Sequence, residues 1–194
     1  MLASNLALTG TYAWFASMTL SLYTVLYGVT VWISAARGMS ALEAGLLILP
    51  MSVLSDLVVG PISKRNLVRG PLIVVAGSSI VDSIGVFFLK TRTPMIWIVL
   101  ITLIFGIMKG TMSSGNQTAL YMQVSEDQIG TASGFLRTFG YIGSIASSAL
   151  IGIVFHTKIT DSGLHHIAII MIVVSIIALI LTIADRRLKT TSSS

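Results

Sequence analysis

Long apolar stretches separated by short polar segments make up most of this chain. Six of the stretches hold about 20 mostly apolar residues or more, which is the length that an α-helix needs to cross the hydrocarbon core of a membrane. The segments between them, such as "RGMS" and "VSEDQ", are so short that consecutive helices must run antiparallel. The predicted spans cover about residues 12–36, 42–62, 71–89, 94–121, 129–155 and 164–184.

This pattern predicts an all-α fold, a polytopic membrane protein in which residues 1–184 form one six-transmembrane-helix bundle. Residues 185–194 are predicted to form a polar tail. The composition supports this class, because 54% of the 194 residues are hydrophobic and only 10% are charged, against roughly 25% charged residues in soluble domains. The chain contains no cysteine, which excludes disulfide and thiol chemistry.

The basic residues of the loops predict the orientation in the membrane. Lys and Arg are enriched in cytoplasmic loops, and the loops on the side of the two termini carry six of them against four on the other side. We therefore expect a multi-pass protein of the cell membrane with both termini in the cytoplasm. The scattered charges indicate no nucleic-acid partner. The two sets are Lys64, Arg65, Arg69, Arg186, Arg187 and Lys189, and Arg37, Lys90, Arg92 and Lys158.

Four ionisable residues fall within the predicted spans, namely Asp56, Asp82, Lys109 and Arg137. A charge at the centre of a membrane helix costs about 2.5–3.5 kcal/mol on insertion scales, so each one is a functional hypothesis. Structural alternatives exist for three of them. The two aspartates lie within reach of the headgroups or of a partner on a neighbouring helix, and Arg137 can extend its side chain to the interface.

Lys109 lies near the middle of its span, within the polar, small-residue stretch "GIMKGTMSSGNQT". Such a stretch is typical of a helix face against protein or water rather than lipid. We expect a water-filled cavity here. Desolvation raises the pKa of a carboxyl and a nearby cation lowers it. This balance can place its titration within the physiological range, as proton-coupled transport requires. The candidate lining residues are Asp82, Lys109, Asn116 and Gln117, with Asp56 as a further one, and Tyr23 and Tyr27 as aromatic contacts or packing residues.

Small residues recur at four-residue intervals in "QIGTASGFLRTFGYIGSIASSALIG", residues 128–152. Small residues let membrane helices approach at backbone contact, so the pattern predicts a packing groove about 18 Å long. A surface on which one helix slides past another is the alternative. Arg137, near the mouth of the groove, is expected to pair with Glu126, Asp127 or a loop carbonyl. The small residues are Gly130 and Gly134, and then Gly140, Ser144, Ser148 and Gly152.

Catalytic and metal-binding motifs are missing from the sequence. It has no Walker loop, HExxH or GxSxG pattern. His165 and His166 are adjacent rather than four residues apart, and no cysteine or carboxylate cluster joins them. We expect neither enzyme activity nor a cofactor or metal.

Three segments carry a resemblance to a known family: "GMSALEAGLLILP" (38–50), "GPISKRNLVRGP" (60–71) and "GTASGFLRTFGYIGSIASSALIG" (130–152). In this order they resemble the C-terminal half of a major facilitator superfamily transporter, most closely the fourteen-span drug:proton antiporters. The second segment is similar to the family's basic cytoplasmic loop. It keeps Gly60, Arg65 and Arg69, but Lys64 stands where that loop has an aspartate.

The resemblance implies proton-coupled export of hydrophobic or cationic compounds. It also implies an N-terminal half of six or eight helices as a partner, on the same polypeptide or a separate one, in addition to lipid, substrate and protons. Two other hypotheses stay open. The solute is anionic or sugar-like, with Lys109 as the central cation, or the chain is a non-transporting membrane protein that uses the small-residue groove to dock another helix.

Overall fold

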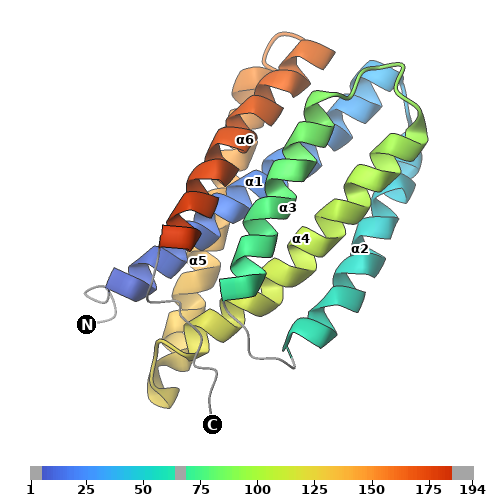
Figure 1. Cartoon of the computed structure of the whole chain (residues 1–194). Coiled ribbons are helices and arrows are strands. Elements are labelled where there is room, and N and C mark those ends of the chain that lie inside the picture. The colour runs from blue at the N-terminus through green and yellow to red at the C-terminus, as the bar shows by residue number, and fades with distance from the viewer. Residues whose placement is uncertain (1–5, 64–68, 185–194) are drawn as a thin grey trace.

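The computed structural model describes residues 6–63 and 69–184, and the regular secondary structure in these ranges is helical (Figure 1). Six of the helices are long and apolar enough to cross a membrane. The predicted all-α, six-helix membrane fold is therefore confirmed. The elements are α1 (Leu6–Arg37), α2 (Ala41–Ser63), α3 (Arg69–Phe87), α4 (Met95–Tyr121), the short 3₁₀ turn η2 (Glu126–Gln128), α5 (Ile129–Val154) and α6 (Asp161–Ala184).

Two helices begin three or more residues before the predicted start. α1 starts at Leu6 rather than near Tyr12, because the segment before Tyr12 lacks charged residues and proline. α6 starts at Asp161 rather than near Leu164. Its first turn is polar but well capped, since the Gly163 N–H donates to the Thr160 hydroxyl at 3.2 Å and an acidic residue favours a helix N-terminus.

A tight turn joins α1 to α2. Gly38 has a φ of 67°, a left-handed conformation that glycine adopts without steric cost. Ser40 and Glu43 then form a capping box, in which the Ser40 N–H and hydroxyl both donate to Glu43 Oε2 at 2.8 Å and the Glu43 N–H donates to Ser40 Oγ at 3.3 Å. This turn holds the two helices as an antiparallel hairpin.

Glycines allow a close helix contact between α2 and α4, which Figure 1 shows side by side at one edge of the bundle. A Cβ atom built on Gly106 would lie 2.7 Å from the Met51 carbonyl oxygen. One built on Gly110 would collide with the Ser55 carbonyl oxygen. The two backbones therefore touch over one turn, as small residues permit in membranes.

α5 packs on α1 through a different row of small residues from the predicted one. Gly140 faces the Phe15 ring and Gly143 faces the Ala16 carbonyl oxygen, and Ser147 is buried. Ser148 and Gly152 are exposed. Of the predicted row, Gly140 packs on α1 and the later residues turn away from it, because each four-residue step advances about 40° beyond a full helical turn. Ser148 and Gly152 remain a predicted packing surface for a helix outside the described structure.

Two further glycines of the predicted pattern lie in the first turns of α5. A Cβ atom on Gly130 or Gly134 would have no atom within 4 Å, so these two glycines make no close contact within the described part of the chain. Ser144 is half-buried. The outer face of α5 therefore carries small residues that no described helix covers.

A polar clamp joins three segments at the end of the bundle away from the termini. Asp161 Oδ1 accepts hydrogen bonds from Trp32 Nε1 and from the Thr91 hydroxyl, both at 2.8 Å, and Oδ2 accepts from the Thr91 N–H at 3.1 Å. Arg37 Nη2 donates to the Thr93 carbonyl oxygen at 2.7 Å. The clamp ties the end of α1, the α3–α4 turn and the start of α6 together.

The α2–α4 contact yields a stability prediction. Gly110→Ala places a methyl group against the Ser55 backbone, so we expect a loss of about 1–3 kcal/mol in unfolding free energy. Gly134→Ala is the matched control, because that site is open and alanine favours a helix by up to about 1 kcal/mol over glycine. Thermal unfolding in detergent measures both, and an equal effect of the two variants would contradict the contact.

Candidate functional site

α1 and α6 run antiparallel and share two polar contacts. Trp14 Nε1 donates to Thr182 Oγ1 at 2.9 Å, and the hydroxyls of Ser21 and Ser175 lie 3.4 Å apart. On each helix the two residues are seven positions apart, which is about two turns or 10.5 Å. The spacings match, so both contacts form together in one register.

Ser79 of α3 extends the second contact into a triangle of hydroxyls. Its Oγ lies 2.9 Å from that of Ser21 and 2.6 Å from that of Ser175, and all three side chains are buried. Three hydroxyls can each donate once and accept once around such a ring. The triangle thus joins α1, α3 and α6 with each donor paired.

Asp82 lies about one turn beyond this triangle on α3, and Thr24 about one turn beyond it on α1, because the two helices run in the same direction. Asp82 is 0% exposed, and neither carboxyl oxygen has a hydrogen-bond partner among the described residues. The hydroxyls of Thr24 and Ser83 are also buried without a partner there. A buried polar group left unpaired costs about 1–3 kcal/mol, so this group is a candidate for function.

The structure corrects two alternatives for Asp82. Its side chain does not extend toward the headgroups, since it is fully buried within the bundle. It also makes no hydrogen bond to a neighbouring helix within the ranges that the structure describes. Asp82 is thus an acid held in the interior without a structural partner there.

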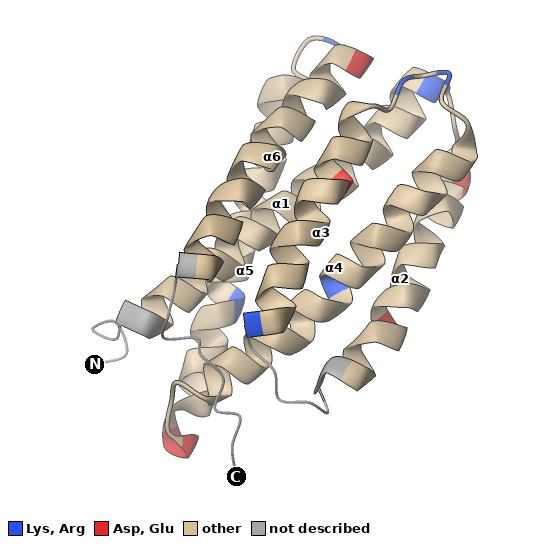
Figure 2. Ribbon diagram, viewed as in Figure 1, with Lys and Arg blue, Asp and Glu red and all other residues tan. Residues whose placement is uncertain are grey.

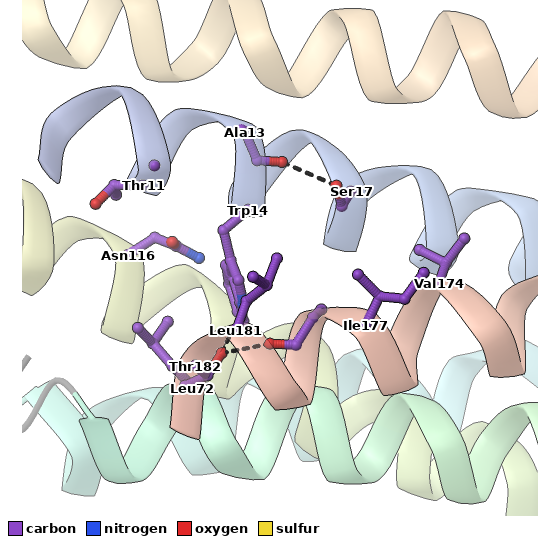
Figure 3. Close-up of a pocket in the computed structure, with 12 residues that line it drawn as sticks. Thr11, Ala13, Trp14, Ser17, Leu72, Asn116, Val174, Ile177, Leu181 and Thr182 are labelled. Atoms are coloured by element: carbon purple, nitrogen blue, oxygen red, sulfur yellow. Dashed lines mark hydrogen bonds between the residues drawn. The ribbon is translucent and has the colours of Figure 1, made fainter. Parts of the chain in front are cut away.

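A cavity of about 570 Å³ surrounds the Trp14–Thr182 contact, at the end of the bundle that carries both termini (Figure 3). It lies mainly between α1 and α6, with one residue each from α3 and α4. The space exists because three small residues recur at helical spacing on one face of α1. The wall consists of Gly10, Thr11, Ala13, Trp14, Ser17, Leu72, Asn116, Val174, Ile177, Ala178, Leu181 and Thr182.

Asn116 is the predicted cavity residue that lines this wall. The remaining predicted residues lie elsewhere in the bundle. Figure 2 shows that most charged residues of the described chain lie near the two ends of the bundle. Lys109 is half-buried on α4, whereas Gln117 and Asp56 are exposed. Tyr23 and Tyr27 stack with their ring centroids 5.2 Å apart on α1, outside the cavity wall.

Arg137 does not pair as expected. It is exposed on α5, and no ion pair or hydrogen bond joins it to Glu126 or Asp127 in the described structure. The reason is distance along the helix, since Arg137 follows the start of α5 by eight residues, about 12 Å.

The basic loop is described only in part. Lys64 and Arg65 lie outside the described residues. Gly60 is exposed in the last turns of α2. Arg69 Nη2 donates to the Ile183 carbonyl oxygen at 2.9 Å, which ties the start of α3 to the end of α6 beside the cavity.

The sequence carried an unused signal for the polar contacts of α6. Ser175 and Thr182 are the polar residues between Ile167 and Ala184, and they lie seven positions apart. A lone pair of polar residues on one face of an otherwise apolar helix indicates an interhelical contact. This spacing was not used in predicting the site, and the roles of Trp14 and Ser21 were not predicted either.

The fold and the buried polar layer define a multi-pass membrane protein built as a six-helix bundle. A family profile described as Major Facilitator Superfamily matches residues 2–148, and the chain belongs to this superfamily. Over 195 residues it is 28% identical to the "Uncharacterized MFS-type transporter YwoD" of Bacillus subtilis (strain 168), covering 96% of this chain and 42% of the relative. Over 95 residues it is 32% identical to the "Uncharacterized MFS-type transporter YvkA" of the same organism, covering 49% and 20%.

The chain thus spans less than half the length of either curated relative.

The unpaired state of Asp82 yields a second stability prediction. Asp82→Asn keeps the size of the side chain and removes the ionisable group, so we expect unchanged or higher thermal stability, because burying a charge is costly. Ser79→Ala, one turn away, is the control and should lower the unfolding free energy by about 1 kcal/mol, since it opens the hydroxyl ring. Thermal unfolding in detergent compares them. A larger loss for Asp82→Asn than for Ser79→Ala would mean that the carboxyl stabilises the fold.

Proposed function

We propose that this chain is one six-helix half of a proton-coupled exporter of hydrophobic or cationic compounds in the cell membrane. The observation that carries the proposal is Asp82, a carboxyl at the interior of the bundle without a hydrogen-bond partner in the described structure. Ionisable residues inside membrane bundles mark ion and proton pathways. Membership of the superfamily supplies the general activity, which is transport.

Asp82 is suited to binding and releasing a proton during a transport cycle. An ionised carboxylate is costly in a closed, apolar interior, whereas the neutral acid is tolerated. When a pathway opens to water, hydration stabilises the charged form of the carboxyl and the proton leaves. The hydroxyls of Thr24 and Ser83, about one turn beyond the serine triangle like Asp82, are also buried without a partner among the described residues.

A second half is proposed to cover α2 and α5. In the apolar stretch of each of these two helices 17% of the residues are buried, against 33–56% in the other four spanning helices. α5 carries Ser144, Ser148 and Gly152 toward its uncovered side, which suits close packing of another membrane helix. The 42% coverage of YwoD leaves room for such a half. Transporters of this superfamily are built from two halves that rock about a central site.

Both termini are proposed to face the cytoplasm, as the loop charges predict.

An anionic solute is the second candidate for the transported compound. Lys109 supports it, because this half-buried cation on α4 makes no ion pair or hydrogen bond with any described residue. Lys109→Gln separates the two, since it should abolish transport of an anion and spare that of a cation.

Proton coupling is tested in everted membrane vesicles that hold the protein as the cell makes it, together with its second half. Adding a transported hydrophobic cation should collapse an imposed proton gradient, followed with a pH-sensitive acridine dye. Asp82→Asn should reduce this response at least tenfold, because the proton-binding group is lost. Asp127→Asn, an exposed acid in the turn before α5, is the control and should respond as the unchanged protein does. Full response in Asp82→Asn would refute the role of Asp82.

The covering of α5 is tested with single-cysteine labels, which the cysteine-free chain makes simple. Ile145 on α5 is 69% exposed and Ile180 on α6 is 59% exposed in the structure. Spin labels at Ile145→Cys should be immobilised by protein in native membranes, whereas labels at Ile180→Cys should show lipid-like mobility and oxygen access. Equal, lipid-like spectra at both sites would contradict a second half on α5.

A further inference from the structure

The amide of Asn116 is fixed in one orientation at the cavity wall. Its Nδ2 donates to the Met112 carbonyl oxygen at 2.9 Å, which only an N–H can do, so the nitrogen and oxygen are assigned by the contact. Asn116 is 1% exposed, and its Oδ1 has no partner among the described residues. Figure 3 shows this side chain reaching into the cavity beside Trp14. The wall therefore presents an unused hydrogen-bond acceptor.

The other polar groups of the wall already have partners. Trp14 Nε1 donates to Thr182 Oγ1, and that hydroxyl donates to the backbone carbonyl one turn earlier at 2.7 Å. The Ser17 hydroxyl donates to the Ala13 carbonyl oxygen at 2.9 Å. Thr11 is paired with the side chain of Gln123. A ligand in this cavity thus meets one acceptor in need of a donor, on Asn116.

The rest of the wall is apolar and uncharged. Trp14 contributes an indole ring whose N–H is fixed by Thr182, and aliphatic side chains from α3 and α6 complete the surface. The volume of about 570 Å³ falls within the range of small-molecule sites, roughly 300–1,000 Å³, which are mostly apolar with a few oriented polar groups. The complementary ligand has an aromatic or apolar body and one N–H donor.

We propose that this cavity is a binding site for apolar aromatic amines, with the amine donating to Asn116 Oδ1 and the ring packing on Trp14. The site lies within one half, because its wall comes from α1, α3, α4 and α6. The helices that we propose to face the second half, α2 and α5, contribute nothing to it. The inference rests on the proposed function for the ligand's place in export, but binding itself requires only this chain.

The test uses two probes of nearly equal shape, 1-aminoanthracene and 1-methylanthracene, on the 194-residue chain in lipid nanodiscs. Saturable quenching of tryptophan fluorescence reports binding, and the part that disappears in Trp14→Phe belongs to this cavity. Empty nanodiscs correct for partition into lipid. The amine should bind more tightly than the methyl compound, by about five- to tenfold, the usual effect of one hydrogen bond to an otherwise unpaired group.

Variants at neighbouring positions of α4 separate the acceptor from general effects. Asn116→Leu should remove the preference for the amine and leave binding of 1-methylanthracene within about twofold. Gln117→Leu, the same change at the next, exposed position, should alter neither affinity. Ala13→Phe should weaken both probes at least tenfold, because it fills the cavity from the exposed side of α1.

Three results would overturn the proposal: no saturable quenching, equal affinity of the two probes for the unchanged chain, or full binding in Ala13→Phe. Loss of both affinities in Asn116→Leu would also overturn it, because the side chain would then maintain the fold rather than select the amine. Binding is measured without flux. Amine-selective binding in a protein that moves no protons would therefore refute the proposed export and leave this site standing.

Discussion

Hydroxyl and indole contacts between α1 and α6 determine how the rest of this bundle is arranged. Inside a membrane no water is present to pair with polar groups, so each one needs a partner from the protein. Trp14 with Thr182 and Ser21 with Ser175 meet this need at matching seven-residue spacings. A shift of one helix by a single residue would break both pairs. The register they set brings Ser79 into the triangle and places Asp82 and the cavity where they are.

The satisfied and unsatisfied polar groups have different roles in this interior. The serine triangle is closed, so it adds rigidity where three helices meet. One turn away, Asp82, Ser83 and Thr24 lack partners in the described structure. Costly groups persist where the surrounding structure holds them in place, and they concentrate at functional sites. The frame of α1, α3 and α6 is what makes the unpaired carboxyl tolerable.

The sequence predicts the six helices well because length and hydropathy alone decide whether a segment spans a membrane. It also singles out Asp82 and Asn116 by their polarity. It does not reveal the cavity, because the wall combines small residues of α1 with side chains of α6 that meet only in the folded register. For a related reason the sequence does not show which small residues of α5 meet α1. Gly140 and Gly143 were equally visible, but only packing against Phe15 and Ala16 decides which row is inside.

The clamp around Asp161 makes the bundle unequal along its length. It fastens α1, the α3–α4 turn and α6 with four hydrogen bonds at one end, while the opposite end holds the cavity. If α1 and α6 separate, the clamp acts as the hinge, and the distance between the two helices increases toward the termini. A small rotation near Trp32 becomes a wide displacement near Gly10, so the cavity lies where this movement is largest.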